Sequence, residues 1–67
     1  MKNNIERRRR ERDMTQQQLA SALGVSRQTV ISLECGRYNP SLTLAHRLAV
    51  VFGTKIEDIF EFEEEKI

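Results

Sequence analysis

The sequence QQQLASALGVSRQTVISLEC, residues 16–35, decides the fold of this chain. In its first half, Leu19 and Leu23 recur at a spacing that places apolar side chains on one face of a helix. In its second half, Val30 and Leu33 follow a spacing of the same kind. The stretch therefore predicts two short helices, each with one face turned towards a core.

Gly24 and Ser26 predict the turn between these two helices. A glycine can adopt the left-handed conformation that ends a helix, and a serine hydroxyl can accept a hydrogen bond at the start of the next one. Helices joined by so short a turn must cross at a steep angle, and the small residue Ala20 suits the crossing point. This is the helix-turn-helix arrangement, whose second helix enters the major groove of DNA.

Capping residues predict three further helices around this pair. The expected N-caps are Asn3 or Asn4, Thr15, Ser26, Ser41 and Thr54, and the expected stops are Gly24, Gly36 and Gly53. Thr15 with Gln18, and Thr54 with Glu57, match the capping-box pattern. The expected helices span residues 5–13, 16–23, 27–35, 42–52 and 55 to 59 or 60. The sequence therefore predicts an all-α fold for a single domain over residues 5–60.

The acidic C-terminal tail, residues 61–67, stands apart from this domain. Phe60 and Phe62 alternate with glutamates, a pattern that fits either a short β-strand or a frayed end. A strand would need a partner, which could be residues 1–4 or the tail of another chain.

The charge of the chain is divided between its two ends. Residues 1–55 contain ten Lys or Arg and four Asp or Glu, whereas residues 56–67 contain one Lys and six Asp or Glu. The net charge of +1 hides this division. The basic part suits a polyanionic partner, which the acidic tail would repel.

The composition also limits the class of protein. The sequence has no apolar run that could span a bilayer and no signal-peptide pattern, so we expect a cytoplasmic location. Cys35 has no second cysteine with which to form a disulfide, and His46 has no partner at metal-ligand spacing. No paired carboxylates, nucleophile–base pair or phosphate loop stands out. We therefore predict neither an enzyme, nor a metal site, nor a cofactor.

The chain resembles the Cro/C1-type helix-turn-helix family, also called the xenobiotic-response-element family. The matching residues are Thr15-Gln16, Leu19-Ala20, Leu23-Gly24-Val25-Ser26, Thr29-Val30, Leu33-Glu34, Gly36, Asn39-Pro40-Ser41, Leu48-Ala49, Gly53 and Glu57-Asp58-Ile59-Phe60. The resemblance covers nearly the whole chain. It implies a compact five-helix, lambda-repressor-like domain and a sequence-specific transcriptional regulator that binds operator DNA as a dimer.

The second helix of the motif carries the candidate base-reading residues. With Val30 and Leu33 turned inward, Arg27, Gln28 and Ser32 point outward, and the family's base-reading positions map onto these three residues. Gln28 can pair with adenine and Arg27 with guanine through two hydrogen bonds each. The nearby Thr29 can reach either a thymine methyl group or a phosphate. The alternative is an ordinary solvated helix face.

The candidate phosphate ligands flank this helix. Gln16 lies at the start of the preceding helix, where backbone N–H groups and the helix dipole attract an anion, and it matches the family's phosphate-binding glutamine. Arg37, Tyr38 and Asn39 follow the reading helix and are expected to hold the same DNA backbone. The Tyr38 ring could equally pack over its own loop.

The arginine run of the first helix could contact DNA phosphates directly, but it also has a structural interpretation. The resemblance implies that Arg9 forms a partly buried ion pair with Glu34, since an unpaired buried carboxylate would be costly. Arg8 replaces a leucine that the family usually carries, so we expect its aliphatic stem to lie over the core. We expect the charged groups of four arginines of this segment to be solvated and to add long-range attraction for DNA; these are Arg7, Arg8, Arg10 and Arg12.

The fourth helix is too apolar for a single buried face. One stripe, expected to face the core, contains Leu42, Ala45, Ala49 and Phe52. A second stripe, expected to form an exposed dimer interface, contains Leu44, Leu48 and Val51, together with Ile59, Phe60 and Phe62. The alternative is that the second stripe completes a five-helix core.

These features lead to a homodimeric regulator, more specifically a repressor, that binds a palindromic operator. Occupancy of a promoter is enough for repression, and the sequence carries no added effector domain. Two alternatives remain. The first is the antitoxin of a toxin–antitoxin pair, with the tail holding the toxin. The second is a protein-interaction adaptor on the same fold, against which the absence of outward-facing acids on the reading helix argues.

Overall fold

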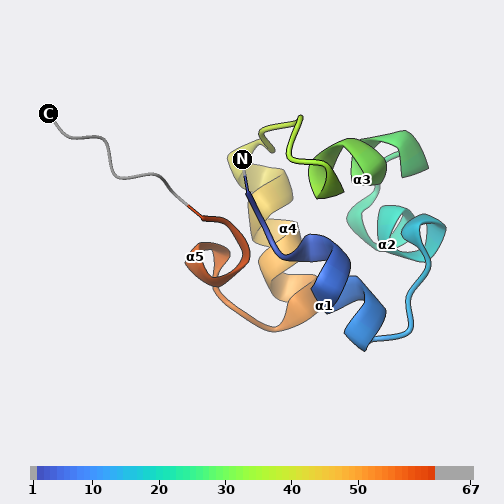
Figure 1. Cartoon of the computed structure of the whole chain (residues 1–67), viewed down its shortest axis with the longest axis horizontal. Helices are drawn as coiled ribbons and strands as arrows, with labels where there is room; N and C mark the ends of the chain where they lie inside the picture. Colours follow the sequence, from blue (N-terminus) through green and yellow to red (C-terminus); the bar gives the residue numbers. More distant parts are fainter. Residues whose placement is uncertain (1, 62–67) are drawn as a thin grey trace, which may run out of the picture.

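Five helices make up the structure, a computed structural model that describes residues 2–61 (Figure 1). They are α1 (Ile5–Glu11), α2 (Gln16–Leu23), α3 (Arg27–Glu34), α4 (Leu42–Phe52) and α5 (Ile56–Ile59). The prediction of an all-α fold is confirmed. α1 ends two residues before the predicted Asp13, which adopts a left-handed conformation with φ 53°. None of the helices within residues 2–61 is long and apolar enough to cross a membrane.

The turn between α2 and α3 forms as its sequence predicts. Gly24 takes the left-handed conformation with φ 73°, and the Val25 N–H donates to the Ala20 carbonyl at 3.0 Å, which ends α2. The Ser26 hydroxyl then accepts from the Thr29 N–H at 3.2 Å and caps α3. Ala20 is fully buried, and α2 and α3 pack against each other. The small side chain allows this close helix crossing.

Two other predicted caps are confirmed. Thr15 and Gln18 form a reciprocal capping box, with N–H to side-chain distances of 3.0 and 2.8 Å. The Ser41 hydroxyl accepts from the Leu44 N–H at 3.2 Å at the start of α4. These caps satisfy backbone N–H groups that have no partner within their own helix.

The structure selects one of the two predicted caps of α1 and contradicts the predicted cap of α5. The Asn3 side chain, rather than that of Asn4, accepts from the Ile5 N–H at 3.1 Å. The expected capping box of Thr54 with Glu57 is wrong: α5 begins after Lys55, which makes no side-chain cap. The Thr54 hydroxyl lies 3.2 Å from an Asp58 carboxylate oxygen and donates to it instead.

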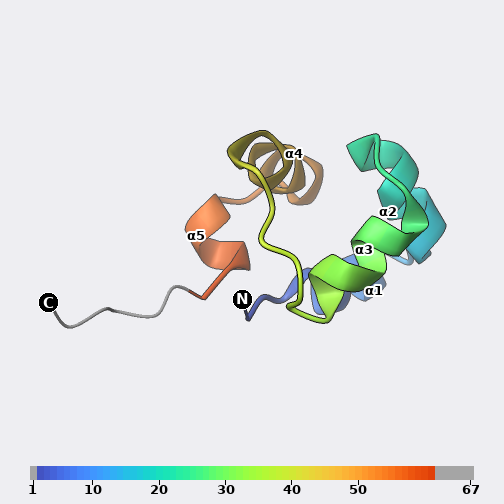
Figure 2. The same ribbon diagram turned by 90° about the horizontal axis from the view of Figure 1, so that it is seen from above.

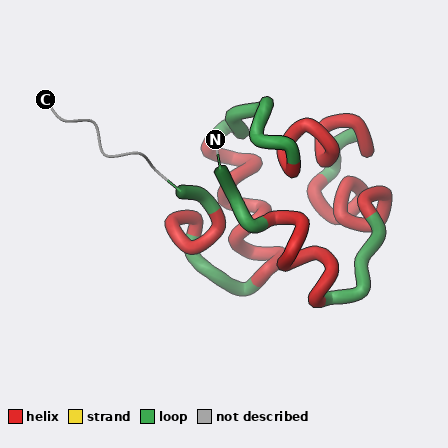
Figure 3. The backbone as a smooth tube through the Cα atoms, viewed as in Figure 1, coloured by secondary structure: helices red, strands yellow, loops and turns green. Residues whose placement is uncertain are grey.

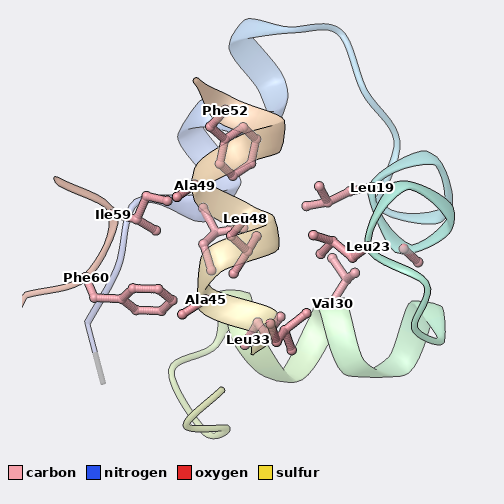
Figure 4. Close-up of a cluster of buried hydrophobic side chains, with 13 residues drawn as sticks. Leu19, Leu23, Val30, Leu33, Ala45, Leu48, Ala49, Phe52, Ile59 and Phe60 are labelled. Atoms are coloured by element: carbon pink, nitrogen blue, oxygen red, sulfur yellow. The ribbon is translucent and has the colours of Figure 1, made fainter. Parts of the chain in front are cut away.

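The hydrophobic core lies around α4, which contacts both α2 and α5 (Figure 4). Figures 1 and 2 show α5 on one side of α4 and the α2–α3 pair on the other. The buried apolar residues are Ile5, Leu19, Ala20, Leu23, Val30, Leu33, Leu44, Ala45, Leu48, Ala49, Phe52, Ile59 and Phe60. The core therefore joins the helix-turn-helix pair to the C-terminal helices.

This core confirms the predicted burial of Ala45, Ala49 and Phe52 but contradicts the predicted interface stripe of α4. Leu44 and Leu48 of the supposed interface are buried, as are Ile59 and Phe60, because α5 and the residue after it cover that side of α4. Val51 is half-buried and packs against the core. The alternative of a completed five-helix core is thus the correct one for these residues, and Phe62 lies outside the described residues.

The outer face of α4 carries different apolar side chains from those predicted. Leu42, predicted to face the core, is 80% exposed and is the first residue of α4. Val50 is 66% exposed. The exposed apolar surface of α4 is therefore built from Leu42 and Val50.

The N-terminal segment pairs with the chain after α5. Asn3 and Phe60 form an isolated antiparallel bridge, and the Glu61 N–H donates to the Lys2 carbonyl at 2.9 Å. Figure 3 shows loops and helices but no strand over residues 2–61. Of the two alternatives for the tail, no strand is formed up to Glu61, although the pairing lies against residues 1–4 as the strand alternative required; the rest of the tail lies outside the described residues.

Candidate nucleic-acid interface

The predicted base-reading residues lie on the outward face of α3. Val30 and Leu33 are fully buried, which turns the opposite side of the helix away from the core. Arg27 and Gln28 are exposed, while Thr29 and Ser32 are half-buried. The hydroxyl groups of Ser26 and Thr29 are hydrogen-bonded to each other at 3.0 Å.

Gln16, the predicted phosphate ligand, lies between the side chains of Glu34 and Arg27, the last and first residues of α3. Its Nε2 donates to Glu34 Oε1 at 3.0 Å. Its Oε1 faces Arg27, whose Nη2 lies 3.5 Å away, at the long limit for a hydrogen bond. The fold therefore brings a predicted phosphate ligand next to a predicted base reader, although eleven positions separate them in sequence.

The predicted ion pair between Arg9 and Glu34 is present. Arg9 Nε donates to Glu34 Oε2 at 2.7 Å, and the two side chains are only 10% and 4% exposed. Arg9 Nη1 also donates to the Met14 carbonyl at 2.8 Å. These bonds tie α1 and the loop after it to the end of α3.

The loop after α3 presents the other predicted phosphate ligands. The Arg37 N–H donates to the Ser32 carbonyl at 3.1 Å, which fixes the chain as it leaves the helix. The side chains of Arg37 and Asn39 are exposed, and Tyr38 is 43% exposed. The three residues are thus accessible beside α3, and their contact with phosphate remains a prediction.

Comparison with known proteins bears directly on this geometry. A helix-turn-helix family model matches residues 5–59, which include all five helices. The chain belongs to the helix-turn-helix family. The resemblance to Cro/C1-type regulators that the sequence motifs indicate is thereby confirmed.

Relatives of this helix-turn-helix protein occur in archaea and bacteria. An uncharacterized HTH-type transcriptional regulator of Archaeoglobus fulgidus is 51% identical over 100% of this chain and 94% of the relative. One of Methanocaldococcus jannaschii is 52% identical over 98% of this chain and 100% of the relative. The cryptic phage CTXphi transcriptional repressor RstR of Vibrio cholerae is 32% identical over 85% of this chain and 51% of the relative. These are names of transcriptional regulators, in agreement with the prediction of a non-enzymatic protein.

The arginines of α1 in this helix-turn-helix protein are engaged by neighbouring groups. Exposed ion pairs join Arg7 to Glu11 at 3.4 Å and Arg10 to Glu6 at 3.0 Å, each four residues apart on the helix. Their side chains are solvated, as predicted, but their charges face acids of the same helix. Glu6 and Glu11 thus offset part of the positive charge of this run.

Arg12 is exposed, as predicted, but Arg8 is not simply solvated, and both side chains make hydrogen bonds that the sequence did not predict. Arg8 is half-buried, and its Nε donates to the Asn4 side-chain carbonyl at 2.9 Å. Arg12 Nη2 donates to the Phe52 carbonyl at 2.6 Å, and its guanidinium lies 5.0 Å from the centre of the Phe52 ring. Arg12 thus satisfies a carbonyl at the C-terminal end of α4, where a cation is favourable.

Two polar contacts at the ends of α2 and α3 were not predicted from the sequence. Arg47 of α4 donates from its Nη1 to the Leu23 carbonyl at 3.0 Å. This bond satisfies a carbonyl at the C-terminal end of α2. Asn3 Nδ2 donates to the Leu33 carbonyl at 2.7 Å, near the end of α3. Neither contact has a local sequence signal, because each joins residues that are distant in the chain.

Proposed function

We propose that the chain is a sequence-specific regulator of transcription that binds double-stranded DNA with α3 in the major groove. The observation that carries this proposal is the outward face of α3, which presents Arg27 and Gln28 to solvent and no free carboxylate. Glu34, the one acid of α3, is held by Arg9 with its side chain 4% exposed. A helix face that is polar, partly cationic and free of exposed acid suits the negatively charged groove of DNA.

Base reading is assigned to the first two turns of α3. Gln28 can form two hydrogen bonds with adenine and Arg27 two with guanine, each pair being worth about 1–3 kcal/mol of discrimination. Ser32 lies one turn beyond Gln28 on the same face and contributes further contacts to bases. Thr29, whose hydroxyl is hydrogen-bonded to the capping Ser26, is assigned a contact with a thymine methyl group or a phosphate.

Phosphate binding is assigned to the residues on either side of this helix. Gln16 lies at the N-terminus of α2, where the helix dipole favours an anion. Arg37, Tyr38 and Asn39 extend from the loop after α3. Such contacts fix the position of the protein on the duplex and carry no sequence information by themselves.

Substitution of Gln28 and Arg37 tests this division of roles on duplexes selected by the wild-type chain. The Gln28→Ala variant should lose preference at one or two base pairs, because only one reading side chain is removed. The Arg37→Ala variant should weaken binding to all sequences alike and reduce the slope of log affinity against log salt by about 1. Binding titrations on matched and mismatched duplexes measure both effects.

Arg7→Ala is the charge-matched control for Arg37→Ala, because it removes one exposed arginine that already faces Glu11. It should leave both the base preference and the salt slope close to those of the wild-type chain. A uniform loss of affinity in both the Gln28 and the Arg37 variant would contradict the assignment of reader and phosphate ligand.

Dimerisation through the outer face of α4 completes the proposal. Leu42, His46 and Val50 follow one another at intervals of four residues and are all exposed, and Val50 also lines a shallow pocket with Gly53 and Ile56. A twofold axis at this face would present two α3 helices to half-sites roughly 34 Å apart on a palindromic operator. The name of the RstR relative, a transcriptional repressor, supports repression as the outcome of binding.

Sedimentation at micromolar concentration tests the dimer. The wild-type chain should sediment at twice its mass of 7.8 kDa, and the double variant Leu42→Asp/Val50→Asp should sediment as a monomer, since it places charge on the apolar face. Thr43→Asp, an exposed substitution elsewhere on α4, is the control and should remain dimeric. A wild-type chain that sediments at 7.8 kDa would rule out this interface.

A further inference from the structure

We infer that Glu34 is a positioning residue for DNA recognition as well as one half of a structural ion pair. Its carboxylate fixes the orientation of the Gln16 amide, and the amide in turn faces Arg27. The inference rests on the proposed function, in which Gln16 binds a phosphate and Arg27 reads a base. It assigns a role in recognition to a side chain that is 4% exposed.

The contacts form a continuous chain from the core to the outward face of α3. Arg9 Nε donates to Glu34 Oε2 at 2.7 Å, and Gln16 Nε2 donates to Glu34 Oε1 at 3.0 Å. Gln16 Oε1 then lies 3.5 Å from Arg27 Nη2. Arg9 is itself held by the Met14 carbonyl at 2.8 Å. Gln16 and Arg27 on the surface are thus linked through Glu34 to the buried Arg9.

The chemistry of the carboxylate decides which way the Gln16 amide points. An ionised carboxylate has no proton to donate, so it accepts only from the nitrogen end of the amide. The oxygen end is then turned towards Arg27, for which it is an acceptor. The nitrogen has two protons, of which Glu34 uses one, and the second remains for a phosphate oxygen. Glu34 thereby prepares both ends of Gln16 before DNA arrives.

The Glu34→Gln substitution should reverse this orientation while keeping the shape of the side chain. An amide has only one oxygen, and the short bond from Arg9 requires it. The amide nitrogen then takes the place of Oε1, where the long 3.5 Å bond from Arg9 Nη2 is lost and the nitrogen faces Gln16, which favours the Gln16 oxygen pointing inward. The nitrogen of Gln16 would then face Arg27, so that two donors oppose each other.

The test is the effect of Glu34→Gln on DNA binding in two backgrounds, wild-type and Gln16→Ala. The probe is the set of duplexes that the wild-type chain selects from a random library, and each variant is titrated where circular dichroism shows it fully folded. In the wild-type background, Glu34→Gln should weaken binding about tenfold, as expected for a hydrogen bond to a charged group, and reduce the preference at the base read by Arg27. In the Gln16→Ala background the same substitution should change affinity by less than about twofold, because its target is gone.

Equal weakening in both backgrounds would overturn the inference and leave Glu34 with a purely structural role. Glu11→Gln is the matched control, since Glu11 is exposed and paired with Arg7, and it should change binding in neither background. Should Glu34→Gln fail to fold, the apolar pair Arg9→Met/Glu34→Met removes the acceptor without leaving a buried charge, and the same comparison applies. A wild-type chain that selects no sequence at all would instead refute the proposed function.

Discussion

Replacing Glu34 by alanine is expected to lower the free energy of unfolding by about 3–5 kcal/mol, because it leaves the Arg9 guanidinium buried without its counter-ion. Arg9 is 8% exposed and donates two hydrogen bonds to this carboxylate, at 2.7 and 3.5 Å. A domain of this size has a total stability of about 3–10 kcal/mol, so the loss is a large fraction of the whole. Urea titration followed by circular dichroism measures it.

Glu11→Ala provides the control for this prediction. Glu11 also pairs with an arginine of α1, but the two side chains are 61% and 66% exposed, so its removal should cost no more than about 0.5 kcal/mol. The double variant Arg9→Met/Glu34→Met should recover most of the stability lost in Glu34→Ala, since no unpaired charge remains. Similar losses for Glu34→Ala and Glu11→Ala would contradict the burial of the Arg9–Glu34 pair.

Leu48→Ala is the second substitution with a large expected effect, and it should cost about 2–5 kcal/mol. Leu48 is fully buried, with α2 on one side of α4 and α5 on the other (Figure 4). Removal of its side chain leaves a cavity where these elements meet, so the variant should be largely unfolded near 37 °C. Thermal melting measures the shift.

Leu42→Ala is the matched control for Leu48→Ala, because it makes the same chemical change on the same helix. Leu42 is 80% exposed, so the free energy of unfolding should change by no more than about 0.5 kcal/mol in the monomer. The comparison also tests the corrected assignment of the faces of α4. A larger loss for Leu42→Ala than for Leu48→Ala would restore the assignment made from sequence.

Local signals account for what the sequence predicted well. Gly24 and Ser26 act on backbone groups within four residues of themselves, so their roles do not depend on the rest of the fold. The exception is Thr54, whose hydroxyl donates to Asp58 instead of accepting at the start of α5. A short helix offers several polar partners within one turn, and sequence spacing does not choose among them.

Tertiary packing decided the features that the sequence did not predict. Apolar residues surround much of α4, so periodicity alone does not separate the buried Leu48 from the exposed Leu42. The hydrogen bond from Arg12 to the Phe52 carbonyl joins the end of α1 to the end of α4, and no local sequence pattern predicts it. In the candidate site, the Arg9–Glu34 pair was implied by family resemblance, whereas the contact of Gln16 with Glu34 became visible only in the fold.

Selection of random duplexes by the wild-type chain, followed by a salt titration on the selected DNA, tests the central claim most directly. We predict a preferred sequence with two symmetric half-sites, because two α3 helices would read it across a twofold axis. Affinity for this sequence should exceed that for random DNA by about 10³-fold or more and should fall steeply as salt increases. A flat sequence profile, with equal affinity for every duplex, would contradict the claim that α3 reads bases.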